Sequence, residues 1–177
     1  MRPFVLIVCL TAAACGNQGP ESPLSPAAVP AVAATQTAVK DGAGLPFSGA
    51  FSADTRAEFP EPGVLVIHFD GDGLATHLGR FELTGVDAGR FPEPVARGNW
   101  VFTAANGDQL FASTESRAEP APPGTDRVTV SGTISGGTGR FAAAGGSFSA
   151  LLAGTHDEST ATGNISGSFE GRLDLNR

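Results

Sequence analysis

The chain has 177 residues, a length that suits one domain with extensions rather than two full domains. Hydrophobic residues make up 41% of it, enough for a buried core, which argues against global disorder. The formal net charge is −7 and no basic patch stands out, so binding to nucleic acid through phosphate contacts is disfavoured.

Residues 1–14 predict a secretory signal peptide. Arg2 supplies a positive charge, residues 4–10 form a short apolar run, and small residues follow. The apolar run is too short to cross a bilayer as a helix, which takes about 20 residues. The segment Ala12-Ala13-Ala14-Cys15 resembles a bacterial lipobox, which implies that Cys15 is lipidated and becomes the first mature residue. Ordinary cleavage after the alanines is the alternative, and the protein would then be secreted.

A lipidated Cys15 predicts an extracytoplasmic protein that a membrane anchor holds at the bacterial cell envelope. Gly16 stands where an Asp retains many lipoproteins in the inner membrane, so the outer membrane is favoured. Cys9 would leave with the signal peptide, so the mature chain keeps a single cysteine and forms no internal disulfide.

Residues 15–45 predict a disordered Pro/Ala-rich tether behind the lipidated cysteine. The segment contains four prolines and no aromatic residue, so it cannot bury enough apolar surface to offset the entropy of ordering. A helix over residues 27–39 is the alternative, but Pro30 lies inside it and caps are lacking.

Residues 46–177 show the period-two alternation that is typical of half-buried β-strands. The clearest segments are 47–54, 128–135 and 164–175, with less regular candidates at 64–69, 74–84, 99–105, 109–115 and 147–152. Eight short strands predict an all-β fold, an eight-stranded antiparallel closed barrel, because closure removes exposed strand edges. A two-sheet sandwich is the alternative.

Two turns are predicted from their residue types. Asn106-Gly107 favours a tight hairpin turn, because both residues tolerate positive φ. Asp70-Gly71-Asp72-Gly73 favours an earlier turn between segments 64–69 and 74–84 rather than a calcium loop. In the resulting hairpin, His68 and His77 share one face, which makes them weak metal-ligand candidates, although a structural site needs four ligands.

The same hairpin does not decide whether Arg80 and Glu82 face the interior or the exterior of the barrel. If their strand face is the interior, both side chains enter the barrel and have to be paired or hydrated. If that face is the exterior, its apolar residues form a patch that another subunit would cover.

The segment Ile134-Ser135-Gly136-Gly137-Thr138-Gly139-Arg140-Phe141, with Gly145-Gly146-Ser147-Phe148 after it, resembles the glycine-rich segment of plant dirigent proteins and allene oxide cyclases. Residues 73–81 and 106–110 are similar to bacterial proteins with the same barrel. The resemblance implies an eight-stranded antiparallel barrel with a cavity and a tendency to form homo-oligomers. Glu58 is the nearest match to the catalytic carboxylate of the cyclases.

No cofactor is predicted. Gly137-x-Gly139 lacks the strand–helix context of a nucleotide-binding loop and is better explained as a tight corner. No Ser/His/Asp or Cys/His arrangement for nucleophilic catalysis is identifiable, and no metal site is predicted beyond the two weak histidine candidates.

These observations favour a non-catalytic binding or structural module that holds a small hydrophobic ligand in a Phe-lined cavity. The candidate ligand-binding residues are His77, Arg80, Phe81, Trp100, Phe102 and Phe111. One alternative is an isomerase or cyclase that resembles allene oxide cyclase and acts on a hydrophobic substrate, with Glu58 or Glu82 as its carboxylate. A second alternative is an oligomerising interaction protein of the cell envelope.

Overall fold

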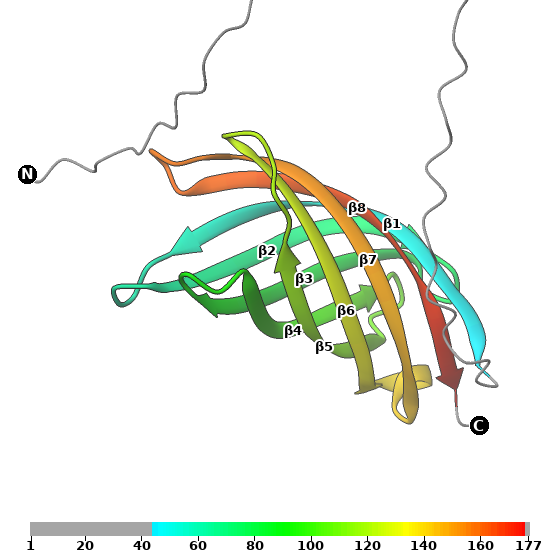
Figure 1. The fold of residues 1–177 in the computed structure, drawn as a ribbon. Coiled ribbons are helices and arrows are strands. Elements are labelled where there is room, and N and C mark those ends of the chain that lie inside the picture. Colours follow the sequence, from blue (N-terminus) through cyan, green and yellow to red (C-terminus); the bar gives the residue numbers. More distant parts are fainter. Residues whose placement is uncertain (1–43, 176–177) are drawn as a thin grey trace, which may run out of the picture. The chain divides into compact units, whose positions relative to one another are not determined.

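A computed structural model describes residues 44–175, which form a closed barrel of antiparallel strands (Figure 1). Each strand pairs with the next one in the chain, and the last pairs back with the first. The strands are β1 (Leu45–Glu58), β2 (Val64–Ala75), β3 (Gly79–Arg90), β4 (Val95–Ala104), β5 (Gln109–Ala118), β6 (Thr125–Gly137), β7 (Ala144–Asp157) and β8 (Thr162–Leu175). The predicted eight-stranded closed barrel is confirmed. The predicted signal peptide, Cys15 and the tether up to residue 43 lie outside the described residues.

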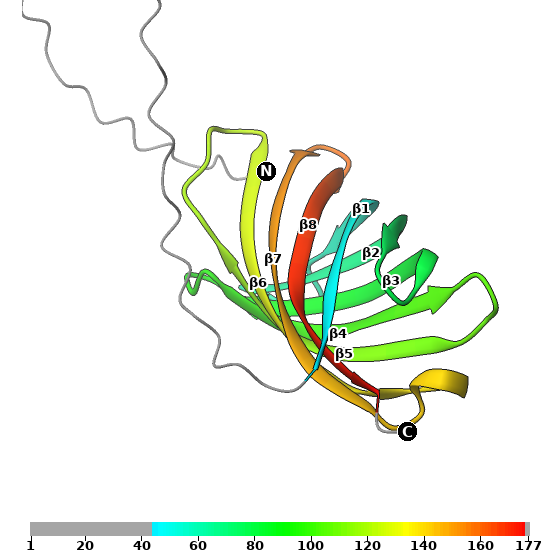
Figure 2. The same ribbon diagram turned by 90° about the vertical axis from the view of Figure 1, so that its right-hand side faces the viewer.

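The strands follow one another around the wall without a crossover. Figure 2 shows β6, β7, β8 and β1 side by side, in the order that the pairing requires. Within the part of the chain that the structure describes, no helix is long and apolar enough to cross a membrane.

The glycine-rich segment forms a tight corner between β6 and β7, as predicted. Its centre is a short 3-10 helix, η1 (Gly139–Phe141), in which Gly139 has a φ of +52°. A Cβ on Gly139 would overlap the carboxylate of Asp108, and a Cβ on Gly137 would overlap the carbonyl of Gln109. The glycines therefore allow this corner to pack closely against the β4–β5 turn and the first residue of β5.

The predicted turn at residues 70–73 is wrong. These residues lie inside β2, and the chain turns at Thr76–Leu78 before β3 begins at Gly79. Gly71 and Gly73 face the interior, and a Cβ on Gly73 would come within 2.6 Å of the Phe81 ring. The glycines are thus required for packing and not for a turn. The Asn106-Gly107 turn is confirmed, because it joins β4 to β5 and Gly107 has a φ of +86°.

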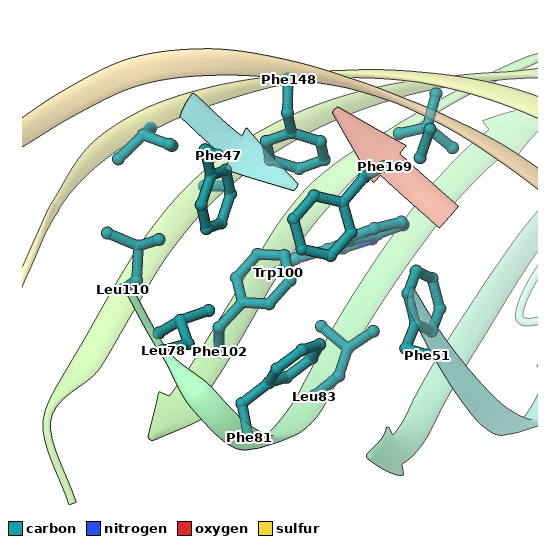
Figure 3. Close-up of a cluster of buried hydrophobic side chains, with 14 of the residues drawn as sticks. Phe47, Phe51, Leu78, Phe81, Leu83, Trp100, Phe102, Leu110, Phe148 and Phe169 are labelled. Atoms are coloured by element: carbon teal, nitrogen blue, oxygen red, sulfur yellow. The ribbon is translucent and has the colours of Figure 1, made fainter. Parts of the chain in front are cut away.

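Aromatic side chains fill the middle of the barrel (Figure 3). All of them are buried, and neighbouring rings meet mostly edge to face, for example Phe47 and Phe102 with ring centroids 6.3 Å apart. Burial of each such side chain stabilises the fold by about 1.5–3 kcal/mol. We call this set the ring cluster: Phe47, Phe51, Phe69, Phe81, Trp100, Phe102, Phe148 and Phe169.

Glycine lies across from the rings on the neighbouring strands. Gly85 is the cross-strand partner of both Phe69 and Trp100, and Gly132 is the partner of Phe148. A Cβ on Gly85 would come within 2.8 Å of the Trp100 ring. Within the ring cluster, every ring except that of Phe102 has such a partner. The glycines provide the space into which the rings fit.

Candidate functional site

The six predicted ligand-binding residues do not converge on one site. Phe81, Trp100 and Phe102 point inward and are buried in the ring cluster, where their neighbours are other rings (Figure 3). Arg80 is exposed on β3, Phe111 is half-buried at an outward position of β5, and His77 lies in the β2–β3 turn.

The alternation along β3 decides which face is the interior. Phe81, Leu83 and Asp87 are buried, whereas Arg80 and Glu82 are exposed and face outward. Arg80 Nη2 lies 3.6 Å from the Asp72 carboxylate on the same outer face. Neither of these two charged side chains therefore enters the barrel interior.

The expected pairing of His68 with His77 on one strand face is wrong, because the hairpin that required it does not form. His68 faces outward in the middle of β2, opposite Arg56 and Val86. His77 has a φ of +64° in the turn, and its Nε2 lies 3.1 Å from the Pro46 carbonyl oxygen. Residues 44–175 contain no group of three or more His, Cys, Asp or Glu side chains that could hold a metal ion.

Neither of the predicted carboxylates faces the barrel interior. Glu58, at the end of β1, is partly exposed and forms an ion pair with Arg56, and its other oxygen lies 3.7 Å from His68 Nε2. The hydrogen bond and charge of the Arg56 guanidinium lower the pKa of Glu58 below its ordinary value. Glu82 is exposed on the outer face of β3.

A carboxylate that was not among the predicted site residues, that of Asp87 on β3, does face the interior. This side chain is only 1% exposed. Its Oδ1 accepts hydrogen bonds from Trp100 Nε1 at 3.2 Å and from Thr114 Oγ1 at 3.0 Å, and its Oδ2 accepts one from Ser116 Oγ. The signal was available, because period two from Phe81 and Leu83 places residue 87 on the same face.

Two neighbouring strands supply the donors to Asp87, and a glycine admits its carboxylate. Trp100 comes from β4, while Thr114 and Ser116 come from β5. Gly98, the cross-strand partner of Asp87, has no side chain, and a Cβ there would overlap Asp87 Oδ1. The buried carboxyl group thus accepts three hydrogen bonds from neutral donors, which satisfy its oxygens in an apolar interior.

A hollow of about 880 Å³ lies on the outer surface of the barrel and crosses five strands, from β8 through β1, β2 and β3 to β4. We call it the outer hollow. Two adjacent rows of cross-strand partners line it. One row contains Thr162, Arg56, His68, Val86 and Asn99, and the other contains Asp54, Asp70, Thr84 and Val101.

The outer hollow combines charged and apolar surface. On β1 and β2, Arg56 and His68 are cross-strand partners in one row of the hollow. Asp54 and Asp70 are cross-strand partners on the same two strands, in the other row. Val86 supplies apolar contact on β3 and is 42% exposed. Such a surface can hold a small molecule that has an apolar part and a polar group.

A smaller hollow of about 450 Å³ lies farther along β1 and β2, and Leu74 and Arg80 line it. Among the predicted ligand residues, Arg80 is the one that lines either of these outer hollows. The period of a single strand does not reveal such surfaces, because they depend on how outward residues of several strands align.

No protein-family model matches the chain, and comparison with curated proteins and with solved structures gives no match. The fold therefore defines the class to which the protein can be assigned: an all-β protein with a closed eight-stranded antiparallel barrel.

Proposed function

We propose that the chain is a non-catalytic binding module of the bacterial cell envelope, held at the membrane by a lipid on Cys15. The lipobox-like segment at residues 12–15 supports the anchor. The barrel supports a binding role through its outer surface, which carries a hollow of about 880 Å³, whereas the ring cluster occupies its interior.

The anchor is tested by metabolic labelling with an alkyne-bearing fatty acid in a bacterial host. The wild-type chain should incorporate the label and fractionate with membranes, and Cys15→Ser should lose both properties. Cys9→Ser is the matched control, because this cysteine lies within the signal peptide and should leave labelling unchanged. Labelling that persists in Cys15→Ser would contradict the lipid anchor.

The outer hollow is the single observation that carries the binding proposal. A small hydrophobic ligand would lie against Val86 and Val101, with a polar group directed toward Arg56 and His68. Small-molecule sites combine apolar contact with polar groups that fix orientation, and here the two valines supply the first and the polar side chains of the two rows supply the second. Because the rings already fill the middle of the barrel, this location replaces the internal cavity that the sequence analysis expected.

The probe for this site is anilinonaphthalene sulfonate, which has fused rings and one anionic group and fluoresces in apolar surroundings. The full chain carrying Cys15→Ser should bind it, and adding Val86→Glu should weaken binding at least fivefold. Leu151→Glu is the control, since Leu151 is 67% exposed on β7 and does not line the hollow. Absence of binding, or equal binding by both variants, would overturn this location, provided that circular dichroism shows an intact barrel.

A further inference from the structure

Two loops of the barrel carry the same four residues. Phe59-Pro60-Glu61-Pro62 follows β1, and Phe91-Pro92-Glu93-Pro94 follows β3. Phe-Pro occurs at no other place in the sequence. Both loops lie at the same end of the barrel, on the left in Figure 1.

The two phenylalanines are exposed, unlike the rings of the interior. Phe59 is 61% exposed and Phe91 is 60% exposed. Among residues 44–175, the other phenylalanines are buried, except for the half-buried Phe111. Exposed aromatic rings on neighbouring loops of a protein surface are typical of an interaction site.

Direct contacts join the two loops into one surface. The backbone N–H of Phe91 donates a hydrogen bond to the Gly63 carbonyl at 2.8 Å. Arg90 Nη2 lies 3.7 Å from Glu61 Oε2, so an ion pair links β3 to the β1–β2 loop. The two loops therefore form one continuous surface, which we call the Phe-Pro patch: residues 59–63 and 91–94.

Contacts within the chain itself fix the backbone of the Phe-Pro patch. Two prolines in each loop restrict the backbone, and a turn closes each loop through Val64 N–H to the Glu61 carbonyl and Glu93 N–H to the Arg90 carbonyl. Binding through such loops requires little further ordering.

The charge of the barrel end that carries the Phe-Pro patch indicates the chemistry of a partner. Each of the four loops there, residues 59–63, 91–94, 119–124 and 158–161, contains one glutamate and neither lysine nor arginine. Of these four glutamates, Glu61 is already ion-paired with Arg90 at the end of β3, and Glu93, Glu119 and Glu158 make the loop surface acidic. An acidic surface with exposed rings is unsuited to an anionic lipid surface and complementary to a basic protein.

We propose that the Phe-Pro patch docks a protein partner whose apolar pockets for Phe59 and Phe91 are surrounded by lysine and arginine. The rings supply the anchors, and the loop glutamates steer and orient the partner. This surface does not line the outer hollow, so the inference stands independently of the small-ligand proposal.

The first test uses a labelled twelve-residue peptide of alternating Lys and Leu, with fluorescence anisotropy as the readout and the full chain carrying Cys15→Ser as the binder. Phe59→Ser/Phe91→Ser should weaken binding at least tenfold. Glu61→Gln/Glu93→Gln should also weaken it and reduce its dependence on salt. Leu151→Ser is the control for an exposed apolar residue elsewhere and should bind like the parent chain.

A Lys-Ser peptide of the same charge should bind more weakly than the Lys-Leu peptide, because it offers no apolar contact. Equal affinity of the two peptides, or no effect of the phenylalanine substitutions, would overturn the proposal. Phe-dependent binding to phosphatidylcholine vesicles in place of the peptide would also overturn it, since a membrane would then be the occupant.

The second test places the photo-crosslinker benzoylphenylalanine at position 59 or 91 of the lipidated chain in the living envelope. Both positions should capture the same protein, with a net positive surface, and position 151 should not. Adducts to lipid alone, or to an acidic protein, contradict the inference.

Discussion

At residue 132 the absence of a side chain admits the ring of Phe148 from the neighbouring strand. A Cβ at this position would overlap the ring, and the same relation joins Gly85 to Trp100. The 24 glycines of the chain are therefore not explained by turns alone. Several of them lie opposite an aromatic ring on a neighbouring strand and leave space for that ring.

Gly132→Ala should lower the free energy of unfolding by about 1–3 kcal/mol, because the added methyl group displaces a packed ring. The measurement is urea unfolding followed by circular dichroism. Gly145→Ala is the matched control, since Gly145 lies on β7 like Phe148 and a Cβ there meets nothing within 4 Å. Equal stability of the two variants would show that the Gly132–Phe148 fit is loose.

Asp87 is the other residue whose role depends on its neighbours. Three donors from β4 and β5 converge on its carboxylate, and all of them lose their acceptor if it is removed. A buried donor without an acceptor costs more than the hydrogen bond contributed. The carboxylate therefore links β3, β4 and β5 in the interior.

Asp87→Ala should lower the free energy of unfolding by about 2–4 kcal/mol, because three buried donors lose their acceptor and a small void is left. Urea unfolding at neutral pH measures this loss. Glu82→Ala removes an exposed carboxylate from the same strand and should change stability little. A loss in Glu82→Ala as large as in Asp87→Ala would contradict the interior role.

At the scale of the strands, two carboxylates at strand ends are held by local hydrogen bonds. Glu58 ends β1 beside Arg56, and Asp157 ends β7, where its Oδ1 accepts from the Ser159 hydroxyl at 2.6 Å and from the Ser159 backbone N–H at 2.8 Å. These hydrogen bonds lower the pKa of both carboxyl groups. Each group therefore favours the folded state above its ordinary pKa, and this contribution is lost as the pH falls through the lowered value.

Arg56→Ala should raise the pKa of Glu58 toward its ordinary value and leave that of Asp157 unchanged. Ser159→Ala should do the reverse, so each variant is the control for the other. Side-chain carboxyl shifts in an NMR pH titration measure both groups at once. Movement of both pKa values in either variant would mean that the effects are not local.

The sequence predicted the barrel and its strand number because alternation and turn residues act locally. Asn106-Gly107 was interpreted correctly for the same reason. Asp70–Gly73 was not, since a glycine required for packing inside a strand has the same appearance as a glycine in a turn. Asp87 could have been found from the period of β3. The outer hollow could not, because it needs the register of five strands.

At the scale of the whole molecule, closure of the barrel places the single tryptophan of the chain inside its hydrophobic core. Trp100 is 1% exposed and contacts rings from β1, β2, β4 and β7. Since these strands lie around the barrel, separation of any one of them from the others should expose Trp100. Its fluorescence should therefore report on the packing of these four strands, and on the whole barrel if unfolding is two-state.

Trp100 emission should be blue-shifted and protected from acrylamide quenching in the native protein, and both properties should be lost in one transition on unfolding. The transition should coincide with loss of the β signal in circular dichroism. Free N-acetyltryptophanamide provides the reference for full exposure. Separate transitions would show that the wall opens in stages.

The glycine–ring pairs also mean that removal of one ring would create a cavity inside the barrel. Where two residues of intermediate size face each other, truncation of one leaves a gap that its neighbour partly occupies. Opposite Phe148 stand Gly132 and Gly171, which have nothing to extend into the space. Replacing that single phenylalanine by alanine would leave an enclosed apolar void about the size of a benzene molecule, and voids of this kind stay dry and take up benzene or xenon.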